Sequence, residues 1–245
     1  MAPREHVERS LRASRLFLGV EDDACTALAA HAAVRRYKRG DYVWHEGEEA
    51  TWMAVIGSGL VKIVRRGSGA IVALLGPHET FGELAIVGGG PYSADAVAAT
   101  KTVEILGLDA HAVRAAIETR PAFARAIELS LVAHGRSLQD KIQIMSAGSV
   151  EKRLAAVLRH LFDRFGDDLE DGSGIVPVAL SRAELASLVG ATIETTIRTM
   201  SRWQRERLVS TQPDGFLLHD VVRLVDLAGG EAGLTVTLRG TGPQA

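Results

Sequence analysis

A glutamate and an arginine lie one helical turn apart, as Glu194 and Arg198, in the stretch SRAELASLVGATIETTIRTMSRWQRERLV. On a helix these two side chains would share one face. A guanidinium donates two hydrogen bonds to the major-groove edge of guanine, and a carboxylate accepts one from cytosine. Side chains at this spacing also form ordinary salt bridges in solvent. The pair therefore predicts either base reading or an exposed ion pair, and its surroundings must decide between the two.

The same stretch carries the local signals of two short helices joined by a tight turn. Ser181, with Glu184 three residues later, forms a capping box that starts the first helix. Gly190 and Ala191 make the turn, and Thr192 can cap the second helix. One face of the second helix would be buried through Thr196, Thr199, Met200 and Trp203. This order predicts a helix-turn-helix that holds the glutamate and the arginine on its outer face.

Positive charge gathers around this unit, although the whole chain has a net charge of −2. The arginines are Arg182, Arg198, Arg202, Arg205 and Arg207. Two short apolar runs joined by Pro-Asp-Gly follow in VSTQPDGFLLHD, which is typical of a β-hairpin wing. A helix that docks on a protein would carry apolar anchors, whereas this outer face offers only Ile197 beside charged residues and Ser201. DNA binding is therefore favoured over the alternative, a ligand-sensing module whose helical domain docks on a protein.

The first half of the chain has a sequence pattern that is typical of antiparallel β-structure. Residues 40–108 contain short alternating apolar runs separated by glycines, among them WMAVIGSGLVKIVRR and KTVEILGL. Short strands at this spacing predict a sandwich or barrel. The Gly-Ser-Gly triplets at 57–59 and 67–69 fit hairpin turns.

A long helix is expected to follow, from Pro121 to about residue 147. Its apolar residues recur at steps of three and four, which is typical of a coiled-coil seam. The seam consists of Ile127, Leu131, His134, Leu138, Ile142 and Met145. The alternative is a helix that lies on the sheet of its own chain, but the stripe continues past what a small β-domain would cover. We therefore expect this helix to form a homodimer.

The stretch FGELAIVGGGPYSADA, residues 81–96, has the composition of an anion-binding loop. Its consecutive glycines expose backbone N–H groups, and Glu83 and Ser93 stand nearby. The place that would suit a cation is occupied by Tyr92. We therefore expect the loop to keep a structural role, in which Glu83 and Ser93 hydrogen-bond to backbone.

The remaining reactive residues form no recognisable site. The single cysteine, Cys25, excludes an internal disulfide and an iron–sulfur cluster held by one chain. The eight histidines form no motif, so no metal is expected, and haem remains open as a cofactor. No nucleophile is paired with a base, and we do not expect an enzyme. The charged N-terminus lacks a signal-peptide core, and no apolar run approaches the ~20 residues that span a bilayer, which predicts a cytoplasmic protein without a membrane partner.

The order of these features resembles the CRP/FNR family of bacterial transcription regulators, from about residue 17 to residue 227. The resemblance rests on a β-roll with FGELAIVGGGPYSADA, a long helix, and a winged helix-turn-helix with SRAELASLVGATIETTIRTMSRW. It implies an α+β fold with a jelly-roll-like sensor domain at 1–120, a dimerisation helix at 121–148, a CRP-type winged helix-turn-helix domain at 149–223 and a tail at 224–245. We have no prediction for the stretch GGEAGLTVTLRGTGPQA that ends the chain.

The resemblance also implies a function for particular residues. The chain is expected to act as a homodimer that binds two-fold symmetric double-stranded DNA and contacts RNA polymerase. By the family pattern, Glu194 and Arg198 would read bases. Phosphates would be contacted by Arg182, Thr192 and Thr195.

In the cyclic-nucleotide sensors of this family, a glutamate binds the ribose and an Arg-Ser pair binds the cyclic phosphate. The matching effector-pocket candidates here are Gly82, Glu83, Leu84, Tyr92 and Ser93. The family's adenine-contacting pair falls on Leu138 and Gln139. Leaving a buried charge without its partner costs on the order of several kcal/mol, and Tyr92 supplies no positive charge. We therefore expect neither cAMP nor cGMP to bind, which leaves the effector unidentified.

Overall fold

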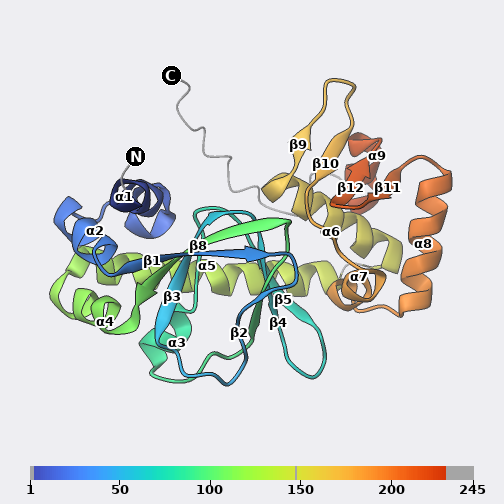
Figure 1. Ribbon diagram of the computed structural model, residues 1–245. Coiled ribbons are helices and arrows are strands. Elements are labelled where there is room, and N and C mark those ends of the chain that lie inside the picture. The colour runs from blue at the N-terminus through green and yellow to red at the C-terminus, as the bar shows by residue number, and fades with distance from the viewer. Residues whose placement is uncertain (1–2, 147, 230–245) are drawn as a thin grey trace.

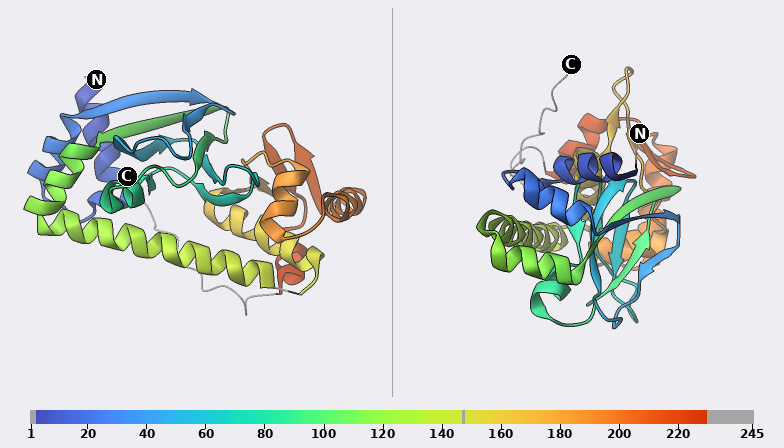
Figure 2. Two further views of the ribbon diagram at one scale, coloured as in Figure 1. Left: turned by 90° about the horizontal axis from the view of Figure 1, so that it is seen from below. Right: turned by 60° about the vertical axis from the view of Figure 1, so that its left-hand side comes forward.

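A computed structural model of the chain describes residues 3–146 and 148–229. The molecule is elongated, with a β-rich lobe at one end and a smaller helical lobe at the other (Figure 1). One long helix, α5 (Pro121–Ser146), runs from the first lobe to the second, as Figure 2 also shows. This arrangement confirms the predicted order of sensor domain, long helix and winged helix-turn-helix.

The β-rich lobe consists of two four-stranded antiparallel sheets. The first has the order β1 (Ala32–Lys38), β8 (Thr102–Asp109), β3 (Trp52–Ser58), β6 (Thr80–Phe81). The second has the order β2 (Tyr42–Trp44), β7 (Asp95–Ala98), β4 (Val61–Val64), β5 (Ile71–Leu75). Their facing apolar side chains form one core with the helices α1 (Pro3–Ala13), η1 (Arg15–Phe17), α2 (Asp22–Ala29), α3 (Glu83–Gly88) and α4 (Ala110–Thr119).

The two Gly-Ser-Gly triplets make different connections. The triplet at 67–69 joins β4 to β5 as a hairpin, as predicted. The triplet at 57–59 does not, because β3 and β4 belong to different sheets. Gly59 has a φ of +78°, and a Cβ at that position would lie 2.3 Å from the Thr102 carbonyl oxygen. Glycine at position 59 is therefore required by a close crossing between sheets, not by a hairpin.

The helical lobe follows α5. It consists of α6 (Val150–Phe165), β9 (Asp167–Asp168), β10 (Gly174–Val176), α7 (Arg182–Val189), α8 (Ile193–Arg205), β11 (Val209–Gln212), β12 (Gly215–Leu218) and α9 (Val221–Ala228). The hairpin β11–β12 is the predicted wing, and it joins β10 and β9 in a third antiparallel sheet. Helix α9 packs on α6, so the expected domain end at residue 223 falls inside a helix of this lobe. Residues 230–245 of the expected tail lie outside the described residues.

Polar contacts connect the two lobes directly. Arg164 of α6 donates to both carboxylate oxygens of Glu79, at 2.9 and 2.8 Å. The Lys62 ammonium of β4 donates to the carboxylate of Glu184 in α7. Arg39, in the turn after β1, reaches the tip of the wing and donates to the Pro213 carbonyl oxygen at 3.1 Å. The helix-turn-helix is therefore held against the sensor lobe at several separate points.

Candidate nucleic-acid interface and sensor pocket

Helix α7 begins and ends where the sequence predicts. The Glu184 amide donates to Ser181 Oγ at 3.1 Å, and the Ser181 amide donates to Glu184 Oε2 at 2.8 Å. This reciprocal pair is the predicted capping box, which satisfies two N–H groups that the helix itself leaves unpaired. Gly190 ends the helix with a φ of +60°, a conformation that glycine adopts without a steric penalty.

Helix α8 is positioned by a cap and by one buried face. The Thr195 amide donates to Thr192 Oγ1 at 3.2 Å, which caps the first turn. The predicted inner face is buried, and it consists of Thr196, Thr199, Met200 and Trp203. The predicted outer face is exposed, and it consists of Glu194, Ile197, Arg198 and Ser201. Ile193 is exposed beside them, and the sequence pattern had not singled it out.

Glu194 and Arg198 therefore point away from the protein, as base reading requires. Within the described residues, no hydrogen bond or ion pair joins their two side chains. The simple alternative of an exposed salt bridge between them does not hold. Both polar ends are free to meet a ligand in front of α8.

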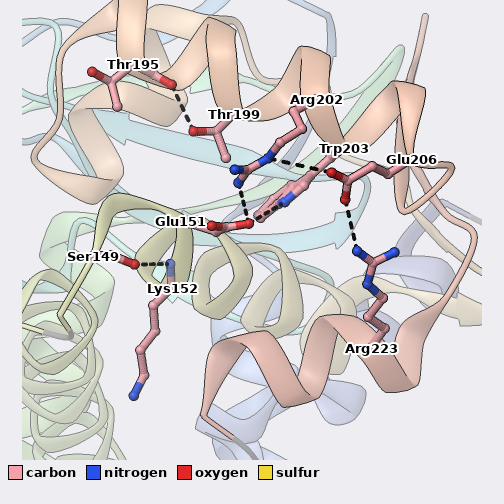
Figure 3. Close-up of polar contacts among 9 residues, drawn as sticks. All are labelled: Ser149, Glu151, Lys152, Thr195, Thr199, Arg202, Trp203, Glu206 and Arg223. Carbon is pink, nitrogen blue, oxygen red and sulfur yellow. Dashed lines mark hydrogen bonds and ion pairs between the residues drawn. The ribbon is translucent and has the colours of Figure 1, made fainter.

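A polar network fixes α8 from behind, as Figure 3 shows. Glu151, in the first turn of α6, accepts from Trp203 Nε1 at 3.0 Å and pairs with Arg202. Glu206 accepts from Arg223 of α9 at 2.9 Å and lies 3.9 Å from Arg202 Nε. The network thus connects α6, α8 and α9. No sequence signal marks it, because Glu151 and Trp203 are far apart in the chain.

The three predicted phosphate contacts have different surroundings. Arg182 Nη2 donates to Thr211 Oγ1 of the wing at 2.6 Å, so this arginine bridges α7 and β11. Thr192 is exposed at the cap of α8. Thr195 is half-buried, and its carbonyl oxygen accepts from Thr199 Oγ1 at 3.0 Å, a contact drawn in Figure 3.

In the sensor lobe, Glu83 lies buried at the start of α3 with 1% of its surface exposed. Thr80 Oγ1 and Ser130 Oγ both donate to Glu83 Oε1, at 2.9 and 2.7 Å. His134 Nδ1 lies 3.5 Å from the same oxygen. Glu83 Oε2 has no hydrogen-bond partner among the described residues. The expectation that Glu83 binds backbone is therefore wrong, because its partners are side chains of β6 and α5.

Tyr92 points into the core and not into a ligand pocket. Its ring stacks on Trp44, and 3% of its surface is exposed. Burial raises the pKa of the Tyr92 hydroxyl to about 12. The neighbouring candidates differ from it, since Ser93 and Leu84 are exposed. Gly82 has a φ of +90°, and a Cβ there would lie 2.9 Å from the Trp44 ring.

Two arginines of a nearby hairpin do not replace the missing cation. Arg65 Nη1 lies 3.9 Å from Glu46 Oε1. The Arg66 amide donates to Glu46 Oε2 at 2.8 Å, and its guanidinium donates to the Glu46 carbonyl oxygen. Both arginines thus contact Glu46, in the loop between β2 and β3.

The predicted seam of α5 divides into two parts. Ile127 is 3% exposed, Leu131 packs on the same core, and His134 faces Glu83. Ile127 was therefore wrongly assigned to the seam, because it is buried against its own β-roll, whereas Leu131 and His134 keep part of their surface exposed and stay a prediction. The second half is exposed at Leu138, Ile142 and Met145. Leu129 and Val132 are also exposed, but on a different side of α5, because the chain from Leu129 to Leu138 makes about two and a half helical turns.

Leu138, at the position of the family's adenine contact, does not face the site around Glu83. Leu138 is exposed on the outer face of α5, whereas Ser130 and His134 are the α5 side chains that meet Glu83. Among the described residues, no group of three or more histidine, cysteine or acidic side chains is placed to bind a metal ion. None of the helices in residues 3–146 and 148–229 is long and apolar enough to cross a membrane.

Comparison with known proteins identifies two domain models in the chain. Residues 34–120 match the cyclic nucleotide-binding domain, and residues 152–227 match the Crp-like helix-turn-helix domain. A relative from Mycobacterium tuberculosis, named as a CRP-like cAMP-activated global transcriptional regulator, is 30% identical over 221 residues. That match covers 89% of this chain and 98% of the relative. The cyclic AMP receptor protein of Thermus thermophilus is 27% identical, with 91% of this chain and all of the relative covered.

Solved structures show the same fold. A CRP-family transcriptional regulator from Thermus thermophilus superposes with a TM-score of 0.67 at 24% identity, over 80% of this chain and 97% of its own. The c-di-GMP-responsive regulator CLP from Xanthomonas campestris superposes with a TM-score of 0.65 at 19% identity. That alignment covers 81% of this chain and 99% of CLP.

Proposed function

The chain belongs to the CRP/FNR family of DNA-binding transcription regulators, and we propose that it binds a two-fold symmetric operator as a homodimer whose sensor lobe does not respond to cyclic nucleotides. The family is one of regulators and not of enzymes. The outer face of α8 carries the proposal. Glu194 and Arg198 stand exposed there, on a helix that Thr192 caps and Trp203 anchors.

The chemistry of that face suits a G·C pair in the major groove. Arg198 offers a planar fork of donors to guanine O6 and N7, and Glu194 offers an acceptor to the amino group of cytosine. Since the two side chains do not neutralise each other within the described structure, both remain available to the bases. Arg182 and the cap of α8 lie at the helix ends, where phosphates of a groove-bound duplex pass.

Homodimer formation is supported by the outer face of α5. Leu138, Ile142 and Met145 follow one another at steps of four and three, so these exposed apolar side chains share one face of the helix. Exposed apolar stripes of this length mark association surfaces. A second copy of α5 is the occupant we propose, because a two-fold axis there would present two α8 helices to one duplex. We propose RNA polymerase as a further partner, from family membership.

The proposal for the sensor lobe rests on charge. The Mycobacterium relative is named as cAMP-activated, but this chain places a buried, neutral Tyr92 where the nucleotide sensors of the family have an arginine. Arg65 and Arg66 are directed to Glu46. A cyclic phosphate would thus enter a site that has a buried carboxylate, Glu83, and lacks an arginine at position 92.

Selection of bound sequences from random duplex DNA tests the proposal. We expect a two-fold site with half-site centres about 34 Å apart. Arg198→Ala should lose roughly 1–3 kcal/mol of binding free energy and relax the preference at one G·C pair per half-site. Arg182→Ala should weaken all sequences alike and flatten the salt dependence. Arg9→Ala, which removes an equal charge from exposed α1, is the control. Equal operator binding by Arg198→Ala and the parent would refute the base-reading assignment.

A further inference from the structure

Two isoleucines stand on the otherwise polar outer face of α8. Ile193 is 46% exposed and Ile197 is 45% exposed. They lie one helical turn apart, which places them on one side of the helix beside Glu194 and Arg198. The large apolar side chains of α8 that serve the core are different ones, Met200 and Trp203. The isoleucines therefore keep much of their apolar surface outside the core of the domain, where a ligand can cover it.

No other described element covers this face. Figures 1 and 2 show α8 as the outermost helix of its lobe, at the end of the molecule farthest from α1. A protein groove that accepts a helix uses apolar anchors at i, i+3, i+4 and i+7. Here the neighbouring outward positions are Glu194, Arg198 and Ser201. Two isoleucines set between a carboxylate and a guanidinium fit a surface that is polar with isolated apolar groups.

The major-groove surface of DNA has that composition. Its base edges present donors and acceptors, and the only apolar group among them is the C5-methyl of thymine. We infer that Ile193 and Ile197 bind thymine methyl groups next to the G·C pair read by Arg198, and so determine part of the operator sequence. This inference rests on the proposed function, since it requires α8 to lie in a major groove.

Helix geometry sets where those thymines lie. Four residues of helix rise about 6 Å, and successive base pairs are separated by about 3.4 Å. The two isoleucines thus span about two base-pair steps. Isoleucine is β-branched and keeps few side-chain rotamers in a helix. Little side-chain entropy is therefore lost when its methyl groups pack against a thymine. Most of the free energy gained by burying apolar surface then contributes to binding.

Replacement of thymine by deoxyuridine tests the contact directly, because it removes the methyl group and leaves base pairing unchanged. Each thymine of the selected half-site is replaced in turn, and the dissociation constant is measured by fluorescence anisotropy. For the parent protein we expect one or two positions beside the G·C pair at which the loss of one methyl weakens binding about fourfold. Positions elsewhere in the half-site should show no change.

Variants connect the effect to each side chain. Ile197→Ala should weaken binding to the operator that contains thymine. It should also make the dissociation constants for thymine and deoxyuridine equal at one position. Ile193→Ala should have the same two effects at a different position. Val222→Ala, at a 73% exposed position of α9, should keep the full difference. Three results would overturn the inference. The selected half-site could lack thymine beside the G·C pair, or the parent could bind thymine and deoxyuridine equally at every position. The isoleucine variants could also keep the parent's ratio of dissociation constants for the two bases. Failure to select any operator would overturn the proposed function as well, whereas these three results leave DNA binding intact.

Discussion

The ring of Tyr92 lies flat on the ring of Trp44, with centroids 3.9 Å apart and planes 4° from parallel. The Tyr92 hydroxyl donates to the Trp52 carbonyl oxygen at 2.5 Å. Both the apolar ring and the polar end of the side chain are thus engaged inside the β-roll. Aromatic pairs of this kind contribute about 0.5–1.5 kcal/mol beyond their buried area. Tyr92 therefore stabilises the sensor lobe at the position where related nucleotide sensors bind phosphate.

Calorimetry with cAMP and cGMP at millimolar ligand should give no saturable heat, because Tyr92, which is neutral and buried, occupies the position of the phosphate-binding arginine. Operator binding should be equal with and without either nucleotide. The Mycobacterium relative, named as cAMP-activated, serves as the positive control under the same conditions. A dissociation constant in the low micromolar range for either nucleotide would show that a cation reaches the pocket from elsewhere.

Tyr92→Arg is expected to lower stability and not to create nucleotide affinity. The tyrosine side chain fills an aromatic slot against Trp44, and a guanidinium there would lose its hydration in an apolar environment. Thermal unfolding should begin at a lower temperature than in Ser93→Arg, whose exposed position accepts a charge. A Tyr92→Arg protein of parental stability that binds cAMP would contradict this structural role.

Alkaline titration should reveal the buried hydroxyl of Tyr92. Its folded pKa is raised to about 12 by burial, above the unfolded value of about 10. The neutral hydroxyl thus stabilises the folded state fully below about pH 10, and this contribution is lost as pH rises from about 10 to 12. The ultraviolet absorbance of tyrosinate should show a last ionisation step, near pH 12, in the parent. Tyr92→Phe should lack that step. Tyr37→Phe, whose parent residue also has a pKa raised by burial, should leave that last step in place.

The dimer prediction now rests on the exposed half of α5. Leu138→Asp combined with Ile142→Asp should give the mass of one chain in light scattering, because both side chains are exposed in the single chain. Val222→Asp adds a charge to a more exposed apolar position of α9, and this variant should keep the mass of the dimer. Ile127→Asp should instead unfold the sensor lobe. An unchanged mass for the double variant would place the interface on another surface.

Local patterns predicted the helix-turn-helix well, since its capping box, its turn and the buried face of α8 each depend on residues close in sequence. Periodicity was less informative for α5. It shows that Ile127 and Leu138 could share a stripe, but not that the first covers its own β-roll while the second faces solvent. The position of Tyr92 likewise follows from a stacking partner, Trp44, that lies far from it in the chain.

The contact between Glu151 and Trp203 yields a stability prediction. Trp203 is fully buried, and its indole N–H donates to Glu151 Oε1 at 3.0 Å. Glu151→Ala would leave that donor unpaired, which costs about 1–3 kcal/mol. We expect a lower free energy of unfolding and weaker operator binding, because α8 loses its anchor on α6. Glu170→Ala, at an exposed acidic position, should change neither quantity, and parental stability of Glu151→Ala would refute the anchoring role.

The ion pair between Lys62 and Glu184 should make the contact between the two lobes sensitive to acid. Partial burial opposes ionisation of Glu184, but the hydrogen bonds from Lys62 and Ser181 outweigh it and lower the pKa of the carboxyl. A lowered folded pKa means that this stabilisation is present above the unfolded value, about 4.3, and is lost as pH falls through the folded value.

Glu184→Gln isolates this charge, because glutamine still completes the capping box of α7. The parent should lose unfolding free energy as the pH falls through the unfolded value of about 4.3 and below it, and the variant should lose less over the same range. At neutral pH the variant should be less stable by up to about 1 kcal/mol, the usual limit for a partly exposed pair. Glu170→Gln should follow the parent at every pH. If Glu184→Gln does so too in urea unfolding, the Lys62 contact contributes nothing to the link between sensor lobe and helix-turn-helix.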